Sequence, residues 1–173
     1  IAEKISASSH GEIEKTGPSA LSSAVVRGLS PEQRRLLERQ LEFPKSVCNN
    51  LPAAWILEGE LNIDIFSKSL VRLFERQTAL RTVFQVYEGD YRQTLKHVNE
   101  ITLPEMEDCS NSQAPMEEAL NKANQMAVQP FEPLNNLLCR CKLFKLSDDK
   151  YLLAFVPRSE EHTSELQSLL IIS

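Results

Sequence analysis

Several features that would define a class of protein are missing from this sequence. It has no apolar run of the ~18–20 residues that a membrane-spanning helix needs, and the apolar residues 152–156 are only of strand length. Four cysteines are too few and too scattered for a disulfide framework. The net charge of −5 argues against a general surface for nucleic acid or anionic membrane. The first residues lack a basic segment followed by an apolar one. No secretion signal is therefore predicted, and we expect a cytoplasmic protein.

What the chain does contain is typical of a globular domain. Hydrophobic residues make up 42% of its 173 residues and charged residues 25%, which is enough apolar material for a core. Residues 1–28 differ from the rest, because six serines together with Gly11, Gly17 and Pro18 leave little to bury. This segment is predicted to be an interdomain linker.

Three helices are predicted. The first begins at Ser30, a good N-cap that is followed by Pro31 and by Gln33 in a capping-box pattern, and it ends before Pro44. The second begins near Asn62, and one apolar stripe runs along it. The stripe consists of Ile63, Phe66, Leu70, Leu73 and Phe74. The third spans about residues 116–128 and should bury Leu120, Ala123 and Ala127.

Five strands are predicted among these helices. Residues 53–59 form the first, with Trp55 and Leu57 on one face and Ile56 on the other. A hairpin follows, whose strands, residues 82–87 and 91–98, flank a turn at residues 88–90. Residues 137–146 and 151–156 form the last two strands. The mixture predicts an α/β (α+β) fold.

Several segments, in order, resemble the condensation domains of nonribosomal peptide synthetases. Residues 29–36 (LSPEQRRL) are similar to the opening Leu-Ser, Gln, Arg, Leu pattern of the family, and residues 50–52 (NLP) to its Asn-x-Pro. The strongest match is residues 76–84 (RQTALRTVF), which resemble the family's R-H-E-x-L-R-T-x-F. Residues 57–61, 130–134 and 137–140 add weaker matches. Together the motifs cover residues 29–157.

The resemblance implies a chloramphenicol-acetyltransferase-like fold, of which this chain would hold an incomplete N-terminal lobe. Condensation domains join acyl or aminoacyl groups, which are held as thioesters on the phosphopantetheine arms of carrier domains, by an amide bond. The implied partners are the peptidyl or aminoacyl carrier domains and the adenylation domain of the same synthetase, and no cofactor is bound directly. The active-site motif of the family is H-H-x-x-x-D-G. Its second histidine orients or deprotonates the attacking amine, a task that suits a group with a pKa near neutrality.

The sequence departs from this pattern after Pro157, where the family has His-His. Residues 158–168 read RSEEHTSELQS, which resembles the in-frame translation of a sequencing-adapter oligonucleotide. Residues 158–173 are therefore predicted to be a non-native tail. The alternative is a natural polar helix that begins at Thr163 or Ser164. Without the histidine motif no catalytic residue is assigned, His162 included, and we expect this chain itself to be inactive although its parent family is enzymatic.

The resemblance also gives Arg81 a role. An arginine of this segment pairs with the aspartate of the family's histidine motif and so supports the active-site loop, and Arg81 is chosen for that role over Arg76. The alternative is a solvated arginine near the negative end of a helix dipole. With the motif absent here, Arg81 should be unpaired or otherwise satisfied.

Other candidate residues have simpler interpretations. Cys139 and Cys141 lie at i and i+2 without a second pair at zinc spacing, which favours core packing over a metal site. His97 is interpreted as an exposed or half-buried strand residue. A local basic set on and just after the first helix is interleaved with glutamates, which is typical of a solvated helix face, although a carrier domain could dock there. The set consists of Arg34, Arg35, Arg39 and Lys45.

Two other functions stay open. One is a related lobe from an epimerisation, cyclisation or ester-forming domain, which residues after Pro157 would distinguish. The other is a non-catalytic carrier-binding domain, which Gln77-Thr78 slightly favours because these residues replace the family's His-Glu.

Overall fold

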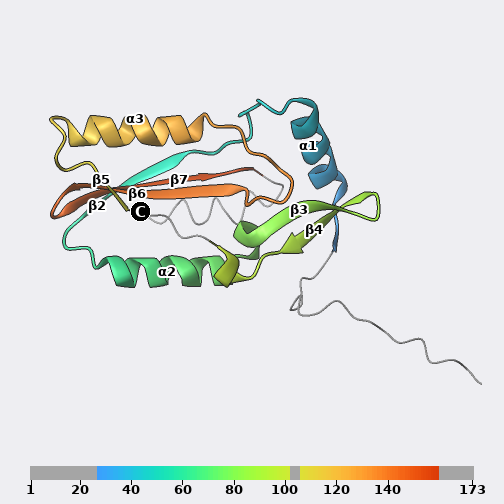
Figure 1. The fold of residues 1–173 in the computed structure, drawn as a ribbon, viewed down its shortest axis with the longest axis horizontal. Helices are drawn as coiled ribbons and strands as arrows, with labels where there is room; N and C mark the ends of the chain where they lie inside the picture. Colours follow the sequence, from blue (N-terminus) through green and yellow to red (C-terminus); the bar gives the residue numbers. More distant parts are fainter. Residues whose placement is uncertain (1–26, 102–105, 160–173) are drawn as a thin grey trace, which may run out of the picture.

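The computed structural model describes residues 27–101 and 106–159. In this part of the chain two β-sheets are flanked by three α-helices (Figure 1). The helices are α1 (Pro31–Glu42), α2 (Ile63–Arg76) and α3 (Pro115–Ala127). Two short 3₁₀ helices, η1 (Thr78–Arg81) and η2 (Val98–Glu100), follow α2 and the hairpin.

The larger sheet has four strands, in the order β2-β7-β6-β5. These are β2 (Ala53–Glu58), β5 (Met106–Asp108), β6 (Cys139–Ser147) and β7 (Lys150–Pro157). The pairs β2–β7 and β6–β7 are antiparallel, whereas β5 is parallel to β6. The mixed α/β prediction is confirmed.

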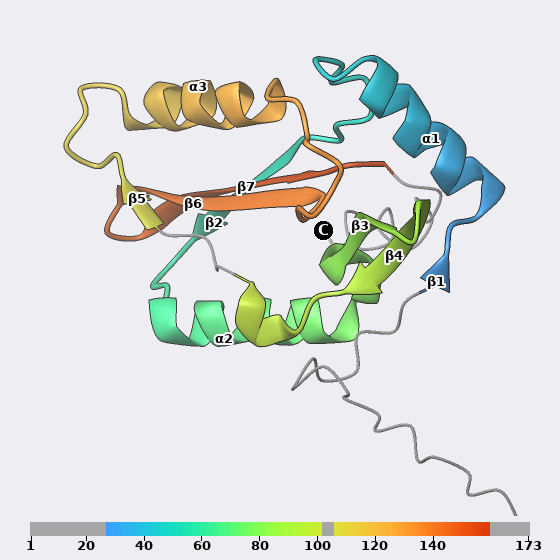
Figure 2. The same cartoon turned by 45° about the vertical axis from the view of Figure 1, so that its right-hand side comes forward.

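Both faces of this sheet are covered by a helix. Figures 1 and 2 show α3 on one face and α2 on the other. Alternation along β7 produces this arrangement. Leu152 and Ala154 pack with Ala119 of α3, whereas Phe155 packs with Phe74 of α2. The sheet is therefore the centre of the described lobe.

The smaller sheet pairs the hairpin strands β3 (Thr82–Tyr87) and β4 (Asp90–Leu95) with β1 (Arg27–Gly28), in the order β1-β4-β3. It lies with α1 at one end of the larger sheet (Figure 2). Leu37 of α1 is fully buried and packs in one cluster with Phe84 of β3 and Val156 of β7. That cluster joins the two sheets beside the end of β7.

The helix starts are as predicted. Ser30 accepts from the Gln33 backbone N–H, and the Gln33 side chain accepts from the Ser30 N–H, so the capping box is complete. Asn62 accepts from the N–H of Ile65 at the start of α2. Pro115 provides the first residue of α3, one position before the predicted start.

The hairpin differs from its prediction. Its turn contains two residues, Glu88 and Gly89, with φ of 51° and 77°. Positive φ at both central positions is the geometry that matches the twist of paired strands. Asp90 is therefore not in the turn but in β4, opposite Tyr87. The second strand also ends at Leu95, three residues before the predicted end.

The prediction of which residues α3 buries is wrong at one position. Leu120 was expected to be buried but is 41% exposed, whereas the fully buried residue is Ala119, one position earlier. A small side chain fits there because α3 lies close against β6 and β7. The three-residue strand β5 was not predicted, because it is too short to show a period.

Two predicted segments lie largely or wholly outside the described residues. Of the expected linker, residues 1–26 are not described, and Arg27–Gly28 pair with Gln93 and Arg92 of β4. Of the expected tail, only Arg158 and Ser159 are described. His162 and the alternative polar helix therefore lie outside the described part.

Candidate functional site

Three of the segments that were matched to the family, those around residues 50, 131 and 140, meet beside the end of β7. Its backbone is held on two sides by hydrogen bonds. On one side the Leu51 N–H donates to the Pro157 carbonyl (2.9 Å) and the Ser159 N–H donates to the Asn49 carbonyl (2.7 Å). On the other, the Arg158 N–H donates to the Leu138 carbonyl (2.8 Å). The path of the chain directly after β7 is therefore fixed by the residues 49–51 and 138.

Arg158 occupies the first position after Pro157, where the family has histidine. The side chain is only 2% exposed, and its Nη2 donates to the Leu36 carbonyl of α1 at 3.1 Å. A guanidinium stays protonated and offers no acceptor. The group at this position therefore cannot act as a general base, in contrast to an imidazole.

The C-terminal end of α3 lies against the same region. A helix leaves its last carbonyls without partners and carries partial negative charge there. Here Asn50 Nδ2 donates to the carbonyls of Ala127 (2.6 Å) and Gln129 (3.0 Å). Arg140 Nη1 donates to the Gln129 carbonyl (2.8 Å) and its Nη2 to the Pro130 carbonyl (2.6 Å). One amide and one cation thus supply donors to the last carbonyl of the helix and to two carbonyls of the loop after it.

Arg140 also stacks on Phe131, with its guanidinium carbon 3.8 Å from the ring centroid. Phe131 is 4% exposed and belongs to the cluster that contains Leu37 and Val156. Burial lowers the pKa of Arg140 below its ordinary value, although the group stays a cation at neutral pH. The contact joins the loop after α3 to the core beneath β7.

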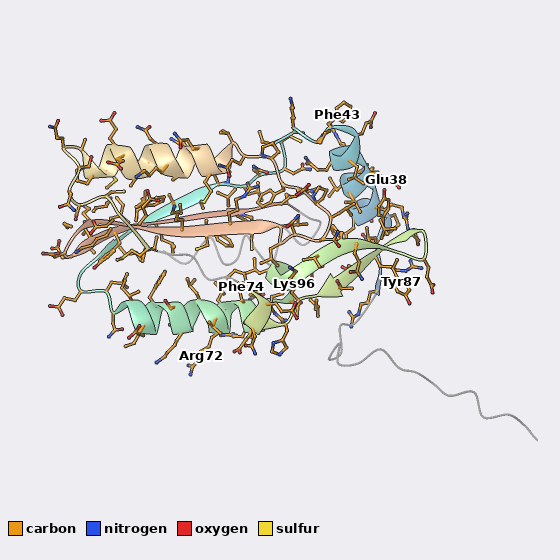
Figure 3. All side chains as sticks on the ribbon, in the orientation of Figure 1. Glu38, Phe43, Arg72, Phe74, Tyr87 and Lys96 are labelled. Carbon is orange, nitrogen blue, oxygen red and sulfur yellow. The ribbon has the colours of Figure 1, made fainter. Side chains whose placement is uncertain are left out.

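Arg81 lies at a different end, that of α2. Its Nε donates to the Phe74 carbonyl (2.7 Å), its Nη1 to the Lys96 carbonyl (2.7 Å) and its Nη2 to the Glu75 carbonyl (3.3 Å). Figure 3 shows Phe74 and Lys96 close together at this end of the helix. Arg81 is therefore otherwise satisfied, by backbone carbonyls that include the negative end of a helix dipole. The ion pairs among the described residues do not include Arg81.

Arg81 is nevertheless connected to the end of β7 through the core. Leu80, its neighbour, is 3% exposed and packs with Cys139 and Phe155. Cys139 is opposite Pro157 in the register of β6 and β7. Three of the five guanidinium donors are engaged in the hydrogen bonds described, so two remain for a further acceptor.

Both cysteines of the pair are partly buried, and Cys139 packs against a core cluster as predicted. Burial raises the pKa of Cys139 to about 12 and that of Cys141 to about 12. Cys139 packs against the cluster of Phe74, Leu80 and Ile101. Within residues 27–101 and 106–159, no group of three or more His, Cys, Asp and Glu side chains is arranged to hold a metal ion.

His97 is exposed as expected, but it is not on a strand. Its Nδ1 accepts from the Asn99 N–H at 3.3 Å and caps η2. The prediction placed it on β4 because alternation continues past Leu95. The Lys96 N–H still donates across the hairpin to the Arg81 carbonyl, and the strand ends there because Arg81 belongs to η1 and η2 begins at Val98.

Arg34, a member of the basic set, pairs with two carboxylates, one of which is not on α1. Arg34 lies 3.9 Å from Glu38, the predicted i,i+4 pair, and 2.6 Å from Asp90 of β4. Arg92 binds the other oxygen of Asp90 at 2.6 Å. The closest pair could not be predicted from helix spacing.

Asn50 and Arg140 were not predicted as individual functional residues. Both belong to segments that were matched to the family, the Asn-x-Pro and the Pro-Leu-x-Arg signals. Their function here is to donate to carbonyls of α3 and the loop after it, which are 77 and 14 residues away in the chain. Only the motif match could have signalled them.

None of the described helices combines the length and the apolar composition that a membrane span requires.

Comparison with known families gives a match over most of the chain. The family model described as Condensation domain matches residues 25–156. Tyrocidine synthase 2 of Brevibacillus parabrevis is 29% identical over 136 residues, which are 79% of this chain and 4% of that protein. Surfactin synthase subunit 2 of Bacillus subtilis is 32% identical over 125 residues, which are 72% of this chain and 3% of that protein. The chain thus spans a few per cent of the length of these relatives.

Solved structures show the same fold. The starter condensation domain of rhizomide synthetase superposes with a TM-score of 0.72 at 17% identity, over 84% of this chain and 36% of that chain. The first condensation domain of the calcium-dependent antibiotic synthetase, in complex with a substrate analogue, gives 0.65 at 20% identity over 78% and 33%. The predicted chloramphenicol-acetyltransferase-like fold is confirmed, and the chain matches about a third of each domain.

Proposed function

The chain belongs to the condensation-domain family, and on that premise we propose that it is part of a domain that forms amide bonds in nonribosomal peptide synthesis. The proposed substrates are aminoacyl or peptidyl thioesters. Their phosphopantetheine arms belong to the partner carrier domains, so the domain meets each arm as part of a substrate. The adenylation domain of the same synthetase is the further proposed partner.

One observation carries this proposal. The backbone after Pro157 is held between Asn49 and Leu138, and the motif-matched segments around residues 50, 131 and 140 surround it. In the family the histidine motif begins at that point. Catalysis requires reacting groups to be held in near-attack geometry. The backbone that carries a general base therefore needs a fixed path, so that the base can reach the amine.

Arg81 is proposed to support the histidine motif of the parent protein. Two of its donors remain after it has bound the end of α2, and an aspartate is the acceptor that the resemblance implies. Its engaged donors would keep the guanidinium oriented. This is a supporting role and not a catalytic one.

We propose further that residues 158–173 are not native and that this chain alone is inactive. The support is the adapter-like reading of residues 158–168 and an arginine at the position of the first histidine. The buried Arg158 would be compatible with a non-catalytic, carrier-binding relative if the tail were encoded. That relative is the second candidate function.

The experiment is to read the source DNA through the codon of Pro157 with long, adapter-free reads, and to express the domain that it encodes with its two carrier domains. We expect the frame to continue into H-H-x-x-x-D-G and mass spectrometry to detect the amide product on the acceptor carrier. A histidine-to-alanine variant of the motif is the control and should give none. A frame that continues through residues 158–173 without the histidines would overturn the enzymatic proposal and support carrier binding.

A further inference from the structure

Asn50 connects two parts of the fold that are distant in the chain. Its backbone forms an isolated antiparallel bridge with Arg158, directly after β7. The flanking hydrogen bonds of Leu51 and Asn49 to Pro157 and Ser159 extend this bridge on both sides. The backbone of residues 49–51 therefore guides the chain where it leaves the sheet.

The side chain of the same residue faces the end of α3. Its amide nitrogen reaches the carbonyl of Ala127, the last residue of the helix, at 2.6 Å, and that of Gln129 at 3.0 Å. An asparagine NH₂ group has two donors, so one side chain can serve both carbonyls. The backbone at Asn50 thus holds the end of β7 while the side chain holds the end of α3.

We infer that Asn50 is a positioning residue, which fixes the two residues after Pro157 relative to the end of α3. The contacts to residues 157–159 are made by backbone atoms, so they do not depend on which side chains stand at 158 and 159. What is positioned follows from the proposed function, since the histidine motif of a condensation domain would start there. The hydrogen bonds of Asn50 and its neighbours to the end of β7, together with those of its side chain to Ala127 and Gln129, are called the clamp below. The clamp does not depend on that function.

The chemistry demands an amide at this position. Aspartate has nearly the same shape, but its ionised oxygens only accept hydrogen bonds and would face two carbonyl oxygens. It would also add negative charge at the negative end of a helix dipole. Alanine removes the donors without adding repulsion. Asn50→Asp should therefore weaken the contact between the end of β7 and the end of α3 more than Asn50→Ala does.

The test measures amide hydrogen exchange by NMR on the isotopically labelled 173-residue chain. The informative amides are those of Leu51 and Ser159, which report the two backbone bonds beside Asn50. The Cys109 N–H, which donates to the Lys145 carbonyl at the other end of the sheet, is the internal reference. The matched control is Asn49→Ala, since among residues 27–101 and 106–159 the Asn49 side chain accepts only from the exposed Cys48 thiol, and its backbone carbonyl is unchanged.

In Asn50→Ala we expect exchange at Leu51 and Ser159 to become about tenfold faster, as the loss of one or two hydrogen bonds predicts. Exchange at Cys109 should not change, and Asn49→Ala should resemble the wild type. Equal acceleration at all three amides would mean general destabilisation and would overturn the inference. No acceleration at Ser159 would overturn it too. Asn50→Ser, whose hydroxyl is too short to serve both carbonyls, gives a second reading if the alanine variant folds poorly.

This measurement is separate from the test of amide formation. If the clamp is present but the encoded parent lacks the histidine motif, the proposed function fails and the clamp stands. If the parent forms amides but Asn50→Ala leaves both amides protected, the clamp fails and the proposed function stands.

Discussion

Nη2 of Arg34 lies 2.6 Å from Oδ1 of Asp90, although the two residues are 56 positions apart. The pair joins the outer side of α1 to the first residue of β4, and Arg92 binds the second carboxylate oxygen. Figure 3 shows the hairpin reaching beyond the body of the protein to Tyr87, which is 49% exposed. The pair holds the hairpin beside its turn, because Asp90 directly follows Gly89 and lies opposite Tyr87.

The Asp90 pair predicts a pH-dependent contribution to stability. The hydrogen bond from Arg34 lowers the pKa of Asp90 below its ordinary value of 3.8. The stabilisation that accompanies a lowered carboxyl pKa is fully present when the pH is above the ordinary pKa. It is lost as the pH falls through the lowered pKa. Asp90→Asn should therefore lower the melting temperature at pH 7 but not at a pH below the lowered pKa. Thermal unfolding followed by circular dichroism at each pH measures this.

The control for that series is Glu38→Gln, because Glu38 is 3.9 Å from Arg34 and is more exposed than Asp90. A surface pair of that kind contributes little. A destabilisation by Asp90→Asn that stays constant from pH 7 to the acid end would show that the carboxylate charge is not its cause.

Arg81→Ala should destabilise the chain by about 2–3 kcal/mol, because it removes three donors from backbone carbonyls and leaves the end of α2 without them. Arg81→Lys should recover only part of this, since an ammonium cannot reproduce the planar fork. Urea unfolding gives the free energies. Arg76→Ala is the matched control, because Arg76 is an exposed arginine at the end of α2, and it should change stability by less than about 0.5 kcal/mol.

In the intact parent, Arg81→Ala should lower stability and turnover together. A loss of turnover at unchanged stability would contradict a supporting role.

Arg140 and Phe131 should be coupled. Arg140→Ala removes the donors to Gln129 and Pro130 as well as the stacked cation, and should cost about 2–3 kcal/mol. A double-mutant cycle with Phe131→Leu isolates the stacking, for which we expect a coupling energy of about 0.5–2 kcal/mol. Additive effects would show that the ring contact contributes nothing beyond packing.

The four cysteines should react at very different rates. Cys48 is exposed, whereas Cys109 is buried and Cys139 and Cys141 have a pKa of about 12. Because the thiolate is the nucleophile, iodoacetamide at pH 7.5 should modify Cys48 first and the strand pair only after unfolding. Peptide mass spectrometry with time gives the rates. Fast modification of Cys139 and Cys141, or zinc retained after dialysis, would contradict core packing.

The local elements could be read from the sequence because their causes are local. Ser30 with Gln33 and Asn62 with Ile65 are caps within four residues, and the apolar stripe of α2 repeats at helical spacing. The same reasoning failed where neighbours in space decided the outcome. On α3 the fully buried residue is Ala119 and not Leu120. In the hairpin, Glu88 adopts positive φ because the paired strands require a two-residue turn.

The sequence by itself determined the family and the helices, since motif order and side-chain periodicity are properties of the chain alone. Only the tertiary structure decided what the motif residues do. Asn50 and Arg140 come from different segments, and nothing in either segment indicates that the end of α3 needs donors. That need arises when the sheet brings the end of α3 beside β7, since the last carbonyls of a helix have no partners of their own.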